Sequence, residues 1–152
     1  MKHIIILFGE MGCGKNYWGE RIAKDRGYIF FDGDHAAPPA MVEKVTRFQL
    51  LSREQILHFV RELCIVITEK ASAAESGIVV AQALYFDEDR KYMAETLGNL
   101  GYRVTFQWVR PPFWRNIRQI YSRPKGSRWV LYWLRNKYWF EQPTHDHDII
   151  GR

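Results

Sequence analysis

The chain has 152 residues, of which 47% are hydrophobic and 26% are charged, and its formal net charge is +5. This length suits one domain with a buried core, and the composition excludes an intrinsically disordered chain. No apolar run approaches the roughly 20 residues that a membrane span requires, and the N-terminal apolar run is too short for a secretory signal. We therefore expect a single domain over residues 1–152, cytoplasmic and without a membrane partner.

A glycine-rich loop follows the first apolar run. HIIILF (3–8) is continuous and rich in β-branched residues, which predicts a strand covered on both faces. GEMGCGK (9–15) fits the pattern G-x-x-x-x-G-K, and KNYWGERIAKDRG predicts a helix that ends near Gly27. Small residues let backbone N–H groups turn around phosphate oxygens, and the helix N-terminus favours the same anion. The loop therefore predicts a nucleotide phosphate site with Lys15 at the β- and γ-phosphates of ATP, bounded by Gly9, Met11, Gly12, Cys13, Gly14, Asn16 and Tyr17.

Asn16 departs from the usual form of such a loop, in which Ser or Thr follows the lysine. That hydroxyl normally binds Mg²⁺, and a carboxamide oxygen can also bind a hard cation or a magnesium-bound water. We expect weakened positioning of the metal rather than its loss. The alternative is a protein that binds nucleotide without turning it over.

Acidic residues follow the second predicted strand. YIFFDGD (28–34) predicts a strand with carboxylates at its exit, and the prolines at 38 and 39 predict a short helix to about residue 48. Phosphoryl transfer needs a base near the acceptor hydroxyl and a metal ion near the phosphates. We expect Asp34 to bind the acceptor and act as general base, and Asp32 to help hold Mg²⁺ through water. The alternative is a solvated acidic turn.

Strands and helices alternate along the rest of the chain. SREQ (52–55) matches a capping box at the start of a long amphipathic helix that ends by residues 76–77. Further strands are predicted at 78–84, 102–109 and 147–150, separated by helices from 87, from 111–112 to about 121, and over 129–140. This alternation predicts a parallel five-stranded sheet with helices on both faces, in which ligands bind at the carboxyl ends of the strands.

The C-terminal segment is basic and aromatic. Residues 110–152 contain 9 Lys or Arg and 3 Asp or Glu, whereas residues 1–109 contain 13 and 14. SRPKGSR (122–128) is a turn-rich loop between two predicted helices, which is a suitable place for a mobile lid over ATP. We expect Arg123 and Arg128 to contact the phosphates, with Arg118 as a third candidate. The same composition leaves nucleic acid binding open, although it is less favoured.

The order of these motifs resembles the gluconokinase and shikimate kinase group of P-loop small-molecule kinases. The quoted features are the glycine loop, the D-G-D-H-A-A-P stretch at 32–38, VVAQAL (79–84), RPKGSRW (123–129) and YWFEQP (138–143). The resemblance implies a three-layer P-loop NTPase fold with a small lid, transfer of phosphate from ATP with Mg²⁺, and often a homodimer. It also implies a role for His35 in binding the acceptor.

Two positions differ from a gluconokinase acceptor site. That site would have Lys after Ala-Leu, where Tyr85 stands, and an acid-Arg cluster before the long helix. We expect Arg53 and Arg90 to substitute as acceptor-binding residues. The resemblance also implies further chain after the last strand to contact adenine, so how this base is held stays open.

Three functions therefore compete. The leading one is an ATP-dependent kinase of a small hydroxylated metabolite, such as the sugar acid gluconate. The second is a nucleic-acid or nucleotide end kinase that uses the basic aromatic segment, and the third is a non-catalytic nucleotide-binding protein. HDHD (145–148) is interpreted as entry to a surface strand rather than a metal site.

Overall fold

Five parallel strands form one sheet in the computed structural model, which describes residues 1–144 and 147–151. The order across the sheet is β2-β3-β1-β4-β5, and the central strand β1 pairs with β3 on one side and β4 on the other. The strands are β1 (His3–Phe8), β2 (Ile29–Asp32), β3 (Gly77–Ala81), β4 (Arg103–Val109) and β5 (His147–Ile150). The predicted parallel α/β sheet is confirmed.

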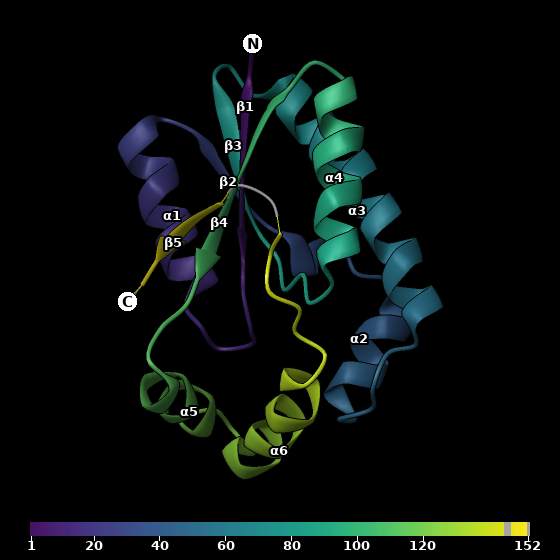
Figure 1. The fold of residues 1–152 in the computed structure, drawn as a ribbon, viewed down its shortest axis with the longest axis vertical. Helices are drawn as coiled ribbons and strands as arrows, with labels where there is room; N and C mark the ends of the chain where they lie inside the picture. The colour runs from purple at the N-terminus through teal and green to yellow at the C-terminus, as the bar shows by residue number, and fades with distance from the viewer. Residues whose placement is uncertain (145–146, 152) are drawn as a thin grey trace.

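Helices cover both faces of this sheet. Figure 1 shows the sheet nearly edge-on, with α1 (Lys15–Arg26) on one side and α3 (Arg53–Ala73) and α4 (Asp87–Asn99) on the other. Side chains alternate along a strand, so Ile4, Ile6 and Phe8 join the core under α3 and α4. Ile5 and Leu7 join the smaller core under α1. This burial on both faces explains the unbroken apolar run of β1.

The remaining helices lie beyond the carboxyl ends of the strands. They are the 3-10 turn η1 (Gly33–Ala36), α2 (Pro39–Thr46), α5 (Phe113–Tyr121) and α6 (Gly126–Lys137). In Figure 1, α5 and α6 form a pair below the sheet, separate from the helices that cover its faces. The carboxyl edge of the sheet is thus enclosed by short helices, as expected for a ligand site.

Local hydrogen bonds set several element boundaries. The capping box before α3 is present, with Ser52 and Gln55 each bonding the other's backbone N–H. The second strand ends at Asp32 rather than at residue 34, because the Asp32 carboxylate accepts the backbone N–H of Asp34 and starts η1. The acidic pair therefore lies on a tight turn.

The predicted loop over 122–128 needs correction. Helix α6 begins at Gly126, so only residues 122–125 connect it to α5. A Cβ on Gly126 would lie 1.9 Å from the carbonyl oxygen of Tyr121, a distance that only glycine allows. This close approach lets the chain turn back at once, and Arg128 lies in the first turn of α6 instead of in a loop.

The C-terminal strand is formed as predicted over His147–Ile150. The preceding half of the HDHD stretch, residues 145 and 146, lies outside the described residues. Within the described ranges, none of the helices combines the length and the apolar character needed to cross a membrane.

Candidate active site

The glycine-rich loop joins the end of β1 to the start of α1. Gly12 and Gly14 have φ angles of +72° and +92°, a region that other residues rarely adopt. Gly14 is the N-cap of α1 and no side chain caps that end of the helix. The N–H groups of the first turn can therefore bind an anion, and the positive end of the helix dipole favours it. The loop's form fits a polyphosphate.

Lys15 lies within the curve of this loop. Its ammonium donates to the carbonyl oxygens of Glu10 at 2.8 Å and Gly9 at 3.2 Å. It is also 3.6 Å from the sulfur of Cys13, which is buried. The cation is thus held against the carbonyl oxygens at the start of the loop.

Asn16 and Asp32 form a direct side-chain pair at the edge of the loop. The amide of Asn16 donates to the Asp32 carboxylate at 2.6 Å, which joins the first turn of α1 to the end of β2. The other carboxylate oxygen of Asp32 accepts the backbone N–H of Asp34 at 3.0 Å. Asn16 keeps its carboxamide oxygen for another partner.

The oxygen donors of this cluster fit Mg²⁺. Asp32 and Asp34 offer carboxylates and Asn16 offers a carboxamide oxygen, all of which are hard ligands. Within the part of the chain that the structure describes, no three acidic, histidine or cysteine side chains gather into a metal site of their own. This matches the usual mode of Mg²⁺, which binds one or two carboxylates together with phosphates of the substrate.

The environment of Asp34 favours the protonated carboxyl. Loss of hydration beside the cavity wall raises its pKa, although the residue as a whole is exposed, and the neighbouring charge of Asp32 raises it further. The ammonium of Lys15, a hydrogen bond from Gln82 and the charge of His35 act in the opposite direction, but the net shift is upward. A carboxylate with a raised pKa is a better proton acceptor, as general base catalysis requires.

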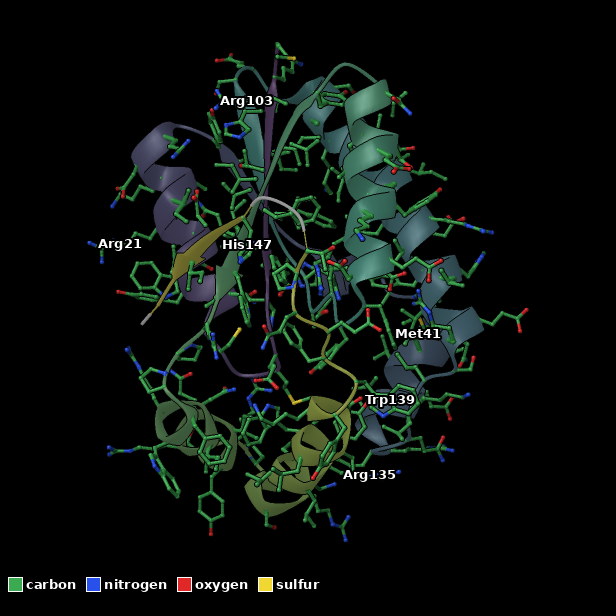
Figure 2. The ribbon with its side chains drawn as sticks, in the orientation of Figure 1. Arg21, Met41, Arg103, Arg135, Trp139 and His147 are labelled. Carbon is green, nitrogen blue, oxygen red and sulfur yellow. The ribbon has the colours of Figure 1, made fainter. Side chains whose placement is uncertain are left out.

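One cavity of about 770 Å³ connects these groups. It extends from the glycine loop and the Asp32–Asp34 turn to α2, the start of α3 and the α5–α6 pair. Figure 2 labels two of its lining residues, Met41 on α2 and Trp139 just after α6. The residues proposed from sequence that line it are Met11, Gly12, Gly14, Lys15, Asn16, Tyr17, Asp32, Asp34, Arg53 and Arg123.

Arg53 lines the cavity with its charge already paired. Its guanidinium meets both carboxylate oxygens of Asp89, at 2.7 and 2.8 Å, and reaches Glu88 at 3.2 Å. The guanidinium also lies 4.2 Å from the centre of the Phe86 ring. Asp89 is 1% exposed, so its buried carboxylate holds the Arg53 guanidinium in place.

Other residues proposed from sequence lie away from the lining. Arg90 is fully buried and donates to the carbonyl oxygens of Leu84 and Glu141. The structure therefore does not bring Arg90 to an acceptor, and its contacts hold the fold together. His35 and Arg128 are exposed on η1 and α6, and Gly9 and Cys13 form the underside of the loop; none of these four lines the cavity.

Two residues at the end of β3 had no role assigned from sequence. The hydroxyl of Tyr85 accepts the backbone N–H of Met11 at 3.3 Å, and its burial raises its pKa. Gln82 is 6% exposed and bonds to Asp34. Gln82 follows the buried strand β3 directly and Tyr85 lies three residues further on. Their position after the carboxyl end of a strand is the sequence feature that could have identified them.

Comparison with known proteins identifies the fold. No protein-family profile matches the chain, and no curated protein matches it in sequence. Solved structures match over nearly the whole chain. A gluconokinase from Sinorhizobium meliloti 1021 has a TM-score of 0.76 and 20% identity, covering 98% of this chain and 81% of that one.

Two further structures share the same architecture. A sugar kinase from Janibacter sp. HTCC2649 has a TM-score of 0.78 and 17% identity, covering 100% of this chain and 85% of that one. The Mycobacterium tuberculosis APS kinase CysC, in complex with AMPPNP and APS, has a TM-score of 0.69 and 17% identity, covering 99% and 88%. The chain therefore has the three-layer α/β fold of the P-loop kinases.

Proposed function

We propose that the protein is an ATP-dependent kinase that phosphorylates a hydroxyl group of a small metabolite. The observation that carries this proposal is that Lys15 and Asp34 line the same cavity. They are close enough for the ammonium to lower the pKa of the carboxyl. A phosphate-binding cation and a proton acceptor thus face one space, which is the arrangement that phosphoryl transfer needs.

The transfer assigns a role to each group. The oxygen of the acceptor hydroxyl bonds to the γ-phosphorus, and its proton passes to the Asp34 carboxylate. The bond between the γ-phosphorus and the bridging oxygen breaks, and ADP leaves. Lys15 and Arg123 hold the phosphate oxygens and offset the charge that develops on them. Asp32 and Asn16 would hold Mg²⁺, which would supply Lewis-acid chemistry to the transfer.

Substitution of the two central residues tests the proposal. We expect Lys15→Ala and Asp34→Asn each to lower phosphate transfer by at least about 100-fold, since each removes a group that acts in the transition state. Lys24→Ala and Asp25→Asn, on the exposed face of α1, are the matched controls. Transfer of label from γ-³²P-ATP to a panel of alcohols is the measurement, with ATP binding followed by calorimetry.

The outcomes separate the alternatives. Transfer that survives Asp34→Asn would contradict the role of that carboxylate. ATP binding without transfer to any acceptor would favour the non-catalytic nucleotide-binding protein. Absence of ATP binding by the native chain would overturn the proposal as a whole.

A nucleic-acid end kinase stays a second candidate. Helix α5 exposes Trp114 and Tyr121, at 76% and 65%, on a segment that also has exposed arginines at 115 and 118. Exposed aromatic rings and cations together suit a single strand. Steeply salt-dependent binding of an oligonucleotide would support this candidate, and no binding at low salt would remove it.

A further inference from the structure

Of the residues that the structure describes, none beside α2 and α3 brings a cation without an acidic partner to the cavity. Among the described residues, the cavity is lined by three cations, Lys15, Arg53 and Arg123. Lys15 lies in the phosphate loop, and Arg123 lies in the α5–α6 turn. Arg53, the first residue of α3, is bound by both oxygens of Asp89 and by Glu88. An anionic acceptor beside α2 and α3 would find this cation already neutralised.

Negative charge faces the same space. Asp32 and Asp34 both line the cavity, whereas the charge of Asp89, which also lines it, is balanced by Arg53. A carboxylate or phosphate on the acceptor would lose its hydration and lie near these groups without a matching cation, which disfavours binding strongly. A sugar acid such as gluconate is therefore poorly matched.

Apolar side chains form much of the remaining wall. They project from neighbouring turns of two helices, so each helix turns one apolar face to the cavity. One of them, Val42, is 46% exposed although it is a large hydrophobic residue, which leaves its surface free for a ligand. The members of this wall are Met41, Val42 and Val45 on α2, and Ile56, Phe59 and Val60 on α3.

We infer that the acceptor is a neutral alcohol with an apolar body, bound against α2 and α3 with its hydroxyl toward Asp34. This inference rests on the proposed kinase function and names its substrate class. Burial of the apolar body against this wall removes it from water, which favours binding. The carboxylates do not repel its uncharged substituents.

Matched probes test the inference by binding alone. With saturating ADP and Mg²⁺, calorimetry compares 4-isopropylbenzyl alcohol, 4-(hydroxymethyl)benzoate and gluconate. The first two carry the same hydroxyl and ring and differ in a neutral or anionic group of similar shape. We expect the neutral alcohol to bind at least about tenfold more tightly than either anion. Equal or tighter binding of an anion, or no binding of the neutral alcohol, would overturn the inference.

Variants on the wall give a second test. Val42→Lys places an unpaired cation there, and we expect it to reduce or reverse the preference for the neutral alcohol. Ile65→Lys is the control, because Ile65 is 54% exposed on α3 and does not line the cavity. An unchanged preference in Val42→Lys would contradict the proposed position. If Val42→Lys fails to fold, the native probe series decides the matter.

Transfer measurements separate this inference from the kinase proposal. Label from γ-³²P-ATP is followed into the same three compounds. Selective binding of the neutral alcohol without any transfer supports the acceptor class and contradicts the kinase. Transfer to gluconate in preference to the neutral alcohol supports the kinase and overturns the acceptor class.

Discussion

At Asp34, opposing influences set the pKa of the side-chain carboxyl. Loss of hydration and the charge of Asp32 raise its pKa, whereas Lys15, Gln82 and His35 lower it. The net rise means that the folded protein holds the proton more tightly than the unfolded chain does. Ionising Asp34 therefore destabilises the fold at pH values above its unfolded pKa, and this effect disappears as the pH falls below that value.

This shift predicts a pH dependence of activity and of stability. The acidic limb of kcat/KM should lie above the ordinary pKa of Asp, because the base must be ionised. Gln82→Leu removes a hydrogen bond that lowers the pKa, so it should move the limb to higher pH, whereas Gln142→Leu on the surface should not. Thermal unfolding tests the effect on stability. Asp34→Asn should raise Tm at neutral pH, because it removes a charge that destabilises the fold, and this increase in Tm should become smaller as the pH is lowered. If the acidic limb of kcat/KM lies at the same pH in Gln82→Leu as in the native protein, then Gln82 does not act on Asp34.

Asn16 gives a second prediction at the scale of one side chain. Its amide is engaged with Asp32 at 2.6 Å, so a metal ion has to share that carboxylate with an N–H donor. Asn16→Thr supplies a hydroxyl ligand, and we expect it to lower the Mg²⁺ concentration needed for half-maximal ATP binding by about tenfold, or about 1.4 kcal/mol. Calorimetry at graded Mg²⁺ measures this, with Asn99→Thr at the end of α4 as control. No change would show that Asn16 has no part in holding the metal.

At the scale of elements, Arg90 joins its own region of the chain to a segment that is distant in sequence. It projects from α4, donates to Leu84 in the loop after β3, and donates to Glu141 after α6, 51 residues away. Its guanidinium lies 4.8 Å from the centre of the Phe8 ring on β1. A single buried cation thus fixes the loop after β3 and the return of the chain from the α5–α6 pair.

Removal of this cation should be costly. Arg90→Met removes the donor from the carbonyl oxygens of Leu84 and Glu141 and removes one of the several partners of Asp87. We expect a loss of about 3–5 kcal/mol in the free energy of unfolding, since a buried cation with its hydrogen bonds is lost. Arg61→Met, at an exposed position on α3, is the control. Urea unfolding measures both variants. A loss in Arg90→Met no larger than in the control would show that these contacts do not stabilise the fold.

At the scale of the whole molecule, local patterns predicted the sheet better than the site. The apolar run of β1, the glycine loop and the capping box at Ser52 each depend on neighbouring residues, and all three are formed. Arg90 could not be placed from sequence, because its burial depends on the loop after β3 meeting the segment after α6. The paired state of Arg53 depends in the same way on Asp89, 36 residues away.

The start of α6 has a different cause. Its first residue, Gly126, lies against the backbone of Tyr121, which is only five residues earlier. Lys125 precedes it with a φ of +57°, an unusual conformation that turn propensity alone does not predict for lysine. The early start of α6 therefore accompanies a rare backbone conformation that the sequence does not indicate.

The α5–α6 pair is attached to the sheet at both ends. Before α5, the backbone N–H of Arg110 bonds to the carbonyl oxygen of Ile150 on the edge strand. After α6, the backbone N–H of Glu141 bonds to the carbonyl oxygen of Tyr85 at 2.7 Å. The pair also contacts the glycine loop, since the Lys137 ammonium lies 3.1 Å from the Glu10 carboxylate, and the segment just after α2, since the Phe48 and Trp129 rings are in contact. The α5–α6 pair is therefore held at several points around the cavity rather than on a single hinge.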